Sequence, residues 1–308
     1  MDGILAVWKP EGWTSHDVVA KVRRILRMKR IGHAGTLDPM VTGVLPLCLG
    51  RSTRVVEYLQ ERPKAYEAVL KLGIATDTED VTGAVLEDQP YPQVTEDAVR
   101  KALRQFVGQI DQIPPMFSAV KVDGKRLYEL AREGKTVERK SRTVTIYQLE
   151  LLDMKLDLQY PEIRFSAVCS KGTYIRTLCV DIGKALGVPA TMASLTRSMS
   201  GGITRERCLT LEQIEQLQQS GQLNEHLIDA DEAIDHLPIA EVPAAVGKLA
   251  LLGQKIVLAQ AVIADSSVAN NGGLVRLYND QRLFIGIFQI DTENALLKPI
   301  KVFSSVAE

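Results

Sequence analysis

The sequence predicts an α+β fold: a mixed, mostly antiparallel sheet with flanking helices, followed by a small C-terminal β-rich module. Three observations support this prediction. Apolar residues recur at strand and helix spacings, but without the regular alternation that a parallel βαβ sheet requires. The chain has 308 residues, enough for one large and one small domain. From about Leu237 onward, prolines, glycines and short apolar runs indicate a separate β-rich unit.

In the first third of the chain, short apolar runs alternate with helical patterns. Ser15 is a candidate cap for a helix whose apolar residues recur every three or four positions as far as Leu26, before a basic last turn. The other elements expected here are a strand at 4–7, a buried strand near 44–49, a helix from about 52 to 59, a strand at 66–72 and a turn at 76–83.

The middle of the chain starts with a capped helix at 95–107, which Gly108 is expected to close. A proline pair at 114–115 then opens a compact basic excursion with a turn at 123–124 and a short helix at 126–132. Further elements are expected as strands at 142–152 and 162–170 and helices at 177–186 and 211–219.

The C-terminal module should begin at about Leu237, where Pro238 and Pro243 mark a boundary, so we divide the chain into 1–236 and 237–308. A turn at 270–273 and short strands at 274–278, 283–290 and 300–303 are expected in the second part.

Composition excludes several classes of protein. An apolar share of 45% excludes general disorder, and no apolar run has the length of a membrane span. The first residues lack the pattern of a secretory signal. The four cysteines are widely spaced, without metal-ligand or disulfide-framework spacing. We therefore expect a cytoplasmic protein without a metal site.

The net charge of −1 hides an uneven distribution. Residues 9–54 hold nine Lys or Arg against three acids, and residues 118–143 hold eight against four. Residues 208–241 hold eight acids and no Lys or Arg. Basic regions of this kind can steer a polyanion, although a solvated helix face explains residues 21–30 equally well.

The segment from Gly32 to Gly43 is the leading candidate for a catalytic loop. It places Asp38 among glycines, small residues and Pro39, directly before an apolar run. Glycines permit unusual backbone conformations and close approach of another molecule. An isolated Asp-Pro would indicate a turn in which the carboxylate bonds its own backbone, so Asp38 needs partners to count as catalytic.

Candidate partners occur far along the chain. Tyr174 and Arg176 would share one face of an extended strand, where an aromatic ring and a guanidinium could hold a planar base and a carboxylate. Tyr66 could stack on a nucleobase, but packing in the core is the more common role of such a tyrosine. By residue type alone, Leu195 indicates core packing and His33 a local loop contact.

These segments together resemble the TruB family of tRNA pseudouridine synthases. The resemblance starts with Lys9-Pro10, continues through 32–54 and includes Lys171-Gly172-Thr173-Tyr174-Ile175-Arg176. It also takes in 64–66, 76–78, 113–121 and 124–129, in one order over about the first 230 residues.

The resemblance implies a role for each candidate. Asp38 would be the nucleophile, Arg176 its partner and Tyr66 the ring stacked on the target uracil, with Tyr174 and Leu195 lining the pocket. Lys9 would support the catalytic loop, and His33 would lie beside the flipped nucleotides. Residues 114–143 would form an RNA-gripping insertion, with Lys121, Lys125, Arg126 and Arg132 as its contacts, and the C-terminal module would be a PUA-like RNA-binding domain.

The implied reaction is the isomerisation of a uridine in the tRNA T-loop, position 55, to pseudouridine. It needs no cofactor and no metal. The implied partner is the tRNA T-arm. The resemblance further implies a monomeric enzyme that needs no protein partner and does not associate with membranes. Two alternatives stay open: a guide-dependent rRNA pseudouridine synthase, for which we would expect basic tails, and a tRNA-binding folding factor with secondary catalysis. Whether Asp38 attacks the base or the ribose also stays open.

Overall fold

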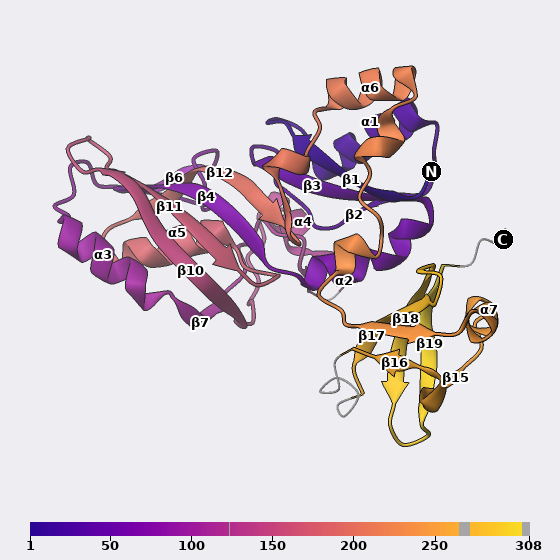
Figure 1. Cartoon of the computed structure of the whole chain (residues 1–308). Coiled ribbons are helices and arrows are strands. Elements are labelled where there is room, and N and C mark those ends of the chain that lie inside the picture. Colours follow the sequence, from indigo (N-terminus) through magenta and orange to yellow (C-terminus); the bar gives the residue numbers. More distant parts are fainter. Residues whose placement is uncertain (123, 265–271, 304–308) are drawn as a thin grey trace.

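The computed structural model describes residues 1–122, 124–264 and 272–303, and its large N-terminal part contains one extended sheet (Figure 1). The strands run in the order β1-β3-β12-β4-β11-β10-β7, with β2 paired to β3 and β13 paired to β12. All pairings in this sheet are antiparallel except that of β12 with β3. The strand bounds are β1 (Gly3–Lys9), β2 (Ile31–His33), β3 (Thr42–Leu49), β4 (Lys64–Leu72), β7 (Gly108–Gln112), β10 (Arg142–Lys155), β11 (Glu162–Cys169), β12 (Ala190–Ser200) and β13 (Ile203–Thr204).

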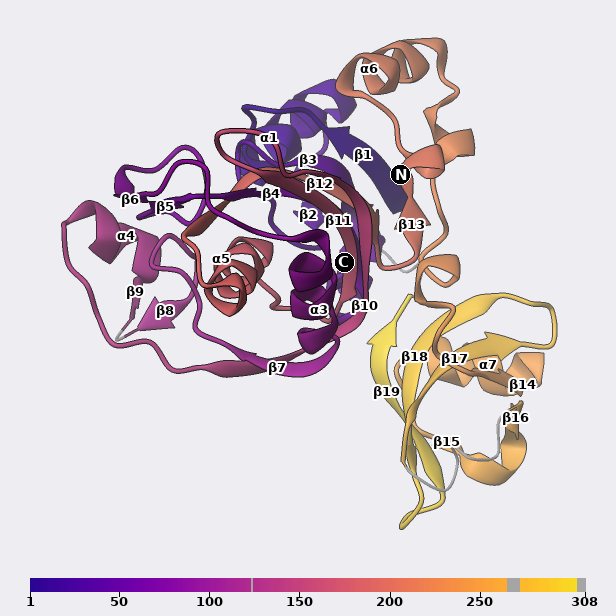
Figure 2. The same ribbon diagram turned by 90° about the vertical axis from the view of Figure 1, so that its left-hand side faces the viewer.

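Helices cover the two halves of this sheet separately. In Figure 2, α3 and α5 lie inside the curve of the sheet, whereas α1 and α6 lie over the half that contains β1 and β3. The helices of this part are α1 (Ser15–Leu26), α2 (Val56–Glu61), α3 (Glu96–Gln105), α5 (Ile175–Leu186) and α6 (Leu211–Ser220), with 3-10 turns η1 (Gly50–Val55), η2 (Arg205–Arg207), η3 (Leu223–His226) and η4 (Glu232–Ile234).

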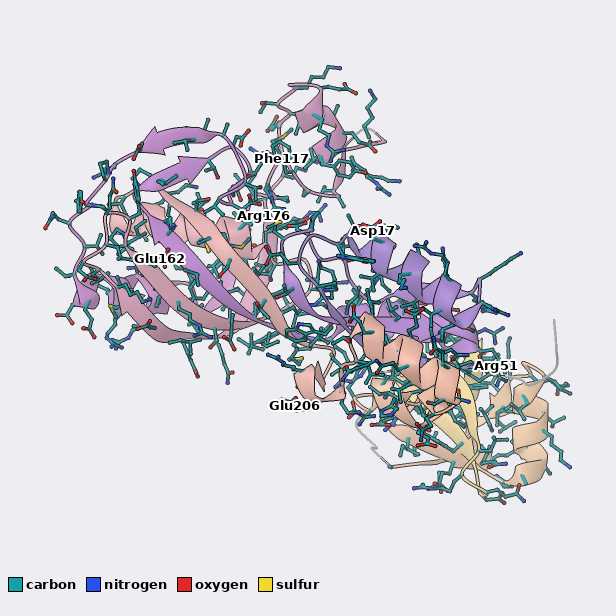
Figure 3. The ribbon with its side chains drawn as sticks, turned by 90° about the horizontal axis from the view of Figure 1, so that it is seen from above. Asp17, Arg51, Phe117, Glu162, Arg176 and Glu206 are labelled. Atoms are coloured by element: carbon teal, nitrogen blue, oxygen red, sulfur yellow. The ribbon has the colours of Figure 1, made fainter. Side chains whose placement is uncertain are left out.

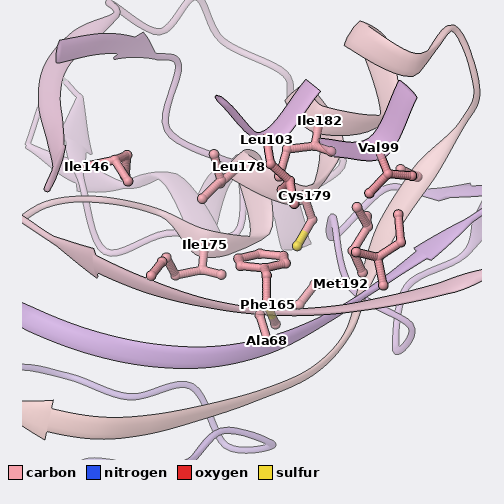
Figure 4. Close-up of a cluster of buried hydrophobic side chains, with 14 of the residues drawn as sticks. Ala68, Val99, Leu103, Ile146, Phe165, Ile175, Leu178, Cys179, Ile182 and Met192 are labelled. Carbon is pink, nitrogen blue, oxygen red and sulfur yellow. The ribbon is translucent and has the colours of Figure 1, made fainter. Parts of the chain in front are cut away.

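Each half has its own apolar core, and the two meet at the middle of the sheet. In the first core, Phe165 of β11 points toward Cys179 of α5 (Figure 4). The second core joins β1 and β3 to α1 and α6. Tyr66 of β4 and Leu195 of β12 are half-buried and pack against both cores. A site built around these two side chains therefore has rigid walls on either side.

The basic excursion forms a separate lobe. It contains the hairpin β8 (Lys121–Val122) and β9 (Lys125–Arg126), then α4 (Leu127–Arg132). Figure 2 shows this lobe standing apart from the large sheet. Leu127 is fully buried, Leu130 is nearly so, and Arg139 donates a hydrogen bond of 3.0 Å to the Pro114 carbonyl across the base of the lobe. A second small hairpin, β5 (Ile74–Thr76) with β6 (Val85–Asp88), forms a sheet of its own, and Asp80 between its strands forms a bridge with Met192 of β12.

The C-terminal module is built on a second sheet with the strand order β15-β19-β18-β17-β14-β16. Its own core includes Phe288 and Leu277, while Ile287 packs on the N-terminal part. Lys301 forms an ion pair of 2.8 Å with Glu57 across this junction. The elements are β14 (Ile239–Val242), α7 (Ala244–Leu251), β15 (Ile256–Val257), η5 (Leu258–Gln260), β16 (Val262–Ile263), β17 (Leu274–Asn279), β18 (Phe284–Asp291) and β19 (Leu296–Val302).

The structure confirms the α+β class, with a mostly antiparallel sheet and a β-rich C-terminal module, and corrects several local expectations. Thr14, not Ser15, caps α1, because its hydroxyl accepts from the Asp17 backbone. Gly108 opens β7, whereas the preceding helix ends at Gln105. The helix expected at 52–59 is a 3-10 turn followed by α2. Strands β2, β7 and β12 were not expected from the sequence. Residues 123 and 265–271, which include part of two expected turns, lie outside the described residues.

In the part of the chain that the structure describes, no helix is both long and apolar enough to cross a membrane.

Phe165→Ala should lower the free energy of unfolding by about 3–5 kcal/mol, because it removes a fully buried ring and leaves a cavity between the sheet and α5. Leu152→Ala on the exposed side of β10 is the matched control and should change stability by less than about 0.5 kcal/mol. Urea-induced unfolding measures both variants. Equal losses in the two would contradict the assignment of this core.

Candidate active site

A cleft of about 430 Å³ opens where the two cores meet. Small-molecule sites commonly have volumes of about 300–1,000 Å³, so the cleft can hold a nucleotide base and its sugar. Asp38, Tyr66, Tyr174, Arg176 and Leu195 all line it, although they come from four distant parts of the chain. The remaining lining residues are Gly35, Thr36, Leu37, Val41, Gln60, Glu61, Lys64, Ser118, Ala119, Lys171, Gly172, Thr173, Ile175 and Arg197.

The Asp38 loop connects β2 to β3 and is anchored on both sides of the carboxylate. Leu37 and Val41 are buried in the second core, so the residues around Asp38 have fixed positions. The Ser15 hydroxyl accepts a hydrogen bond of 2.9 Å from the Leu37 backbone N–H. This explains why Ser15 does not cap its own helix. The Asp38 side chain itself remains 48% exposed, and so is accessible from the cleft.

Lys9 supports this loop from below. Its side chain is fully buried, and its ammonium donates to the carbonyls of Pro10, Trp13 and Pro39, the last at 3.0 Å. Burial lowers the pKa of Lys9 to about 8, although the charge of Asp38 opposes the shift. With three carbonyl partners and no exposed surface, Lys9 acts on the site through the loop and does not line the cleft.

Arg176 joins three segments around Asp38. One terminal nitrogen lies 3.0 Å from an Asp38 carboxylate oxygen and donates to the Phe117 carbonyl at 2.8 Å. The other donates to the Thr78 carbonyl at 2.8 Å and lies 3.9 Å from an Asp80 oxygen. The Arg176 side chain is only 7% exposed. The guanidinium is therefore divided among several partners and does not grip Asp38 as a two-pronged fork.

The structure corrects the expected backbone around this arginine. Tyr174 and Arg176 do not share the face of a strand: Tyr174 is the N-cap of α5, and Arg176 lies in its first turn. Gln112 fixes the cap residue from both sides, because its side chain accepts from the Tyr174 N–H at 3.0 Å and donates to the Tyr174 carbonyl at 3.2 Å. Both side chains nevertheless line the cleft.

Tyr66 and Leu195 form the floor of the cleft on neighbouring strands. In the pairing of β4 with β12, Leu195 lies opposite Ala68 and Arg197 lies opposite Tyr66. Burial raises the pKa of the Tyr66 phenol, and the charge of Arg197 partly opposes the shift. A ring and an aliphatic side chain of this kind can hold a flat, uncharged base.

His33 lies at the end of β2, not in a loop, and does not line the cleft. Its ring packs edge-on against that of His16, with centroids 5.5 Å apart. Burial lowers the pKa of His33, and the charges of His16 and Arg197 act in the same direction. The structure thus places His33 beside the Asp38 loop as a neutral ring at neutral pH.

The basic residues expected to contact RNA lie together on the lobe. Lys121, Lys125 and Arg126 belong to the hairpin, and Arg132 ends α4. Both arginines pack against the ring of Tyr128, with guanidinium carbons 5.7 and 5.5 Å from its centroid. Figure 3 shows the lobe projecting from the body of the protein, with Phe117 at its base near Arg176.

Sequence reasoning missed three residues of this site. Arg197 is fully buried at the cleft wall, Lys64 is buried at its edge, and Asp80 faces Arg176. The only sequence signal for Arg197 and Lys64 is their position, because each is a basic residue two positions from a predicted site residue, Leu195 or Tyr66. Among the described residues, no group of three or more His, Cys, Asp and Glu side chains is arranged to hold a metal ion.

Comparison with known proteins decides the family. Residues 23–175 match the sequence model of the TruB family pseudouridylate synthase N-terminal domain. The chain belongs to the TruB family. Residues 176–235 match the tRNA pseudouridylate synthase B C-terminal domain, and 238–303 match the C-terminal domain of pseudouridine synthase II TruB. The protein is therefore an isomerase of the pseudouridine synthase class.

Curated TruB relatives align over most or all of the chain. The tRNA pseudouridine synthase B of Bacillus subtilis (strain 168) is 41% identical over 311 residues, covering 100% of this chain and 99% of that protein. The protein of the same name from Bacillus licheniformis is 50% identical over 239 residues, or 77% of each chain. Among solved structures, one of a Cbf5-Nop10-Gar1 complex matches 98% of this chain and 84% of that chain, with 28% identity and a TM-score of 0.76.

Arg176→Lys should slow pseudouridine formation by about 100-fold or more, because a single ammonium cannot hold Asp38, Thr78 and Phe117 in place together. Arg164→Lys, in an exposed ion pair with Glu67, is the control and should leave the rate nearly unchanged. Single-turnover conversion of an unmodified tRNA transcript measures both. A near-normal rate for Arg176→Lys would show that only the charge at this position matters.

Proposed function

We propose that this protein isomerises the T-loop uridine at position 55 of tRNA to pseudouridine, with Asp38 as nucleophile on a flipped-out base. The observation that carries the proposal is the half-exposed Asp38 carboxylate, 3.0 Å from a buried arginine, at a cleft lined by Tyr66, Tyr174 and Leu195. The relatives named tRNA pseudouridine synthase B support tRNA as the substrate.

The reaction rearranges one nucleotide without adding or removing net atoms. The N1–C1′ bond breaks, the freed base turns in the pocket, and C5 bonds to C1′. The C5 hydrogen then leaves to solvent as N1 gains a proton. These reaction steps need a nucleophile or charge stabiliser beside C1′ and C6. They also need a closed space that keeps the detached base from diffusing away.

Five side chains of the cleft have a place in this scheme. Asp38 supplies the negative oxygen, and Arg176 orients it from one side. Tyr66 and Leu195 provide a flat, apolar surface for the uracil ring, and Tyr174 borders the same space. The phenol of Tyr66 is a candidate proton carrier, because burial raises its pKa and so keeps it protonated at neutral pH. A base can reach this pocket only by leaving its stack.

The lobe at 114–143 is the proposed grip on RNA. Arg176 bonds to the carbonyl of Phe117 at the base of this lobe as well as to Asp38. RNA could be held by four basic side chains of the lobe: Lys121, Lys125, Arg126 and Arg132. It would then be linked through Phe117 to Arg176, the side chain that orients the nucleophile. This coupling favours an RNA-modifying enzyme over a folding factor in which catalysis is secondary.

A guide-dependent rRNA enzyme is the weaker candidate. Solved structures of complexes that contain Cbf5 share the fold at 27–28% identity, whereas the proteins named tRNA pseudouridine synthase B reach 41–50%. We further propose that the protein acts as a monomer in the cytoplasm, that the functional domains are 1–236 and 237–308, and that the second binds RNA as a PUA-like module.

Wild-type protein should release the C5 hydrogen of one uridine per tRNA, without added cofactor and in the presence of a chelator. The measurement is tritium release from C5-labelled tRNA, with the modified position mapped afterwards. Asp38→Asn should bind the same tRNA but lose at least about 1,000-fold in rate, because it removes the nucleophile while keeping its shape.

The control is tRNA in which the T-loop uridine is replaced by cytidine, which should release no tritium from any other position. Release from several uridines per tRNA would defeat the proposed site specificity. Retention of about a tenth of the wild-type rate by Asp38→Asn would defeat the assignment of Asp38 as nucleophile.

Binding of tRNA should weaken steeply with salt, despite the net charge of −1. Each phosphate contacted contributes about 0.9 to the log–log slope, so replacing Lys125, Arg126 and Arg132 by Gln should make the slope shallower by about 2–3. The matched control replaces Arg100, Lys101 and Arg104, which are exposed on α3, by Gln. If both triple variants changed the slope equally, the loss of overall charge would be sufficient and the lobe would not be the grip.

A further inference from the structure

Arg197 is among the largest fully buried side chains in the described part of the chain, and it bonds to both ends of the Asp38 loop. Its Nε donates to the Val44 carbonyl at 2.8 Å. Its terminal nitrogens donate to the Gly35 carbonyl at 3.2 Å and, in a longer contact of 3.5 Å, to that of Thr36. Gly35 and Val44 lie on opposite sides of Asp38 in the chain, so one guanidinium joins the two ends of the loop.

The backbone at the same position adds a second constraint. Arg197 pairs with Gly43 in the one parallel register of the large sheet. Gly43 has a φ of +118°, and a Cβ there would come within 2.2 Å of the Arg197 carbonyl oxygen. The backbone of Arg197 therefore fixes the position of Gly43, where the loop joins β3.

Arg197 also lies beside the floor of the cleft. It is directly opposite Tyr66 across the β4–β12 pair, and both side chains line the cleft. Arg197 thus bonds to the loop that carries Asp38 and neighbours the ring expected to stack on the base.

Nothing in the described part of the chain neutralises this charge directly, because no carboxylate there forms an ion pair with Arg197. Burying a cation without such a partner is costly, and replacement by a well-packed apolar side chain would remove that cost. A cation in such a position contributes little net stability, so its contacts point to another role. Because hydrogen bonds from a charged donor are strong and directional, the contacts of Arg197 fit it to hold geometry.

We propose that Arg197 is a positioning residue that fixes the Asp38 loop and the Tyr66 ring relative to each other for the reaction. The inference rests on the proposed roles of Asp38 and Tyr66. In this proposal Arg197 sets the distance between the nucleophile and the stacked base, whereas Arg176 holds the carboxylate itself. A displacement of about 1 Å in such a geometry can cost about 100-fold in rate.

Arg197→Met tests the proposal, because methionine fills much of the same space without any hydrogen bond. Its single-turnover rate on bound tRNA should fall by about 100-fold, while the tRNA dissociation constant stays within about threefold of wild type. Arg276→Met is the matched control: Arg276 also donates to three main-chain carbonyls, those of Asp231, Asp235 and Leu237, but far from the cleft. It should lose stability with little change in the single-turnover rate.

Two further variants separate geometry from charge and from misfolding. Arg197→Lys keeps the charge, but its single nitrogen cannot reach Gly35 and Val44 together, so it should be nearly as slow as Arg197→Met. Arg197→Ala leaves a space for free guanidinium, which at low millimolar concentration should restore part of its rate but none of that of Asp38→Asn. Rescue requires a folded protein, so it distinguishes a lost positioning group from a collapsed site.

A folded Arg197→Met with a rate within about threefold of wild type would overturn the inference. So would a near-normal Arg197→Lys, a loss of rate matched by an equal loss of tRNA binding, or absence of guanidinium rescue in a folded Arg197→Ala. Assays of wild-type protein and Arg276→Met on the same tRNA distinguish failure of the inference about Arg197 from failure of the proposed function. If neither forms pseudouridine, the proposed function is wrong; if both do and Arg197→Met matches them, only the role of Arg197 is wrong.

Discussion

The site depends on one buried guanidinium, that of Arg176. It meets Asp38 from the β2–β3 loop, Thr78 from the turn after β5 and Phe117 from the base of the basic lobe. Successive members of this set are 40 and 39 residues apart in the sequence, and each contributes an oxygen to the same side chain. Because a buried arginine must have its donors satisfied, the fold has to bring all three segments together before the charge can be buried. Satisfying Arg176 and assembling the cleft are therefore the same event.

The sheet supplies the frame in which this can happen. Its two halves are covered by different helices and have separate cores, and the parallel contact between β12 and β3 joins them. Tyr66 and Leu195 lie on the central strands at this junction and pack against both cores. A cleft placed there has side chains from both halves as its walls. Small shifts in either half would change the distance between Asp38 and the floor of the pocket.

The sequence predicted best what depends on short stretches of chain. The helical pattern before Leu26, the capped helix after Thr95 and the glycine-rich segment around Asp38 all depend on neighbouring residues. Prediction from the sequence failed where contacts between distant parts of the chain determine the structure. Strand β12 was missed because its polar residues Ser194, Thr196 and Arg197 interrupt the apolar pattern. They lie there because that strand lines the cleft and pairs with both β3 and β4, which no local pattern reveals.

The charge distribution follows from the same arrangement. Lys9, Arg176 and Arg197 are all buried around the Asp38 loop, and each donates to at least two main-chain carbonyls. Three cations thus surround a segment with one carboxylate, although the protein as a whole carries a net charge of −1. Carbonyl oxygens solvate these cations without cancelling their charge, so a positive field persists at the cleft. Such a field attracts the phosphates on either side of a base that enters the pocket. One set of buried side chains can therefore shape the loop and draw in an anionic strand.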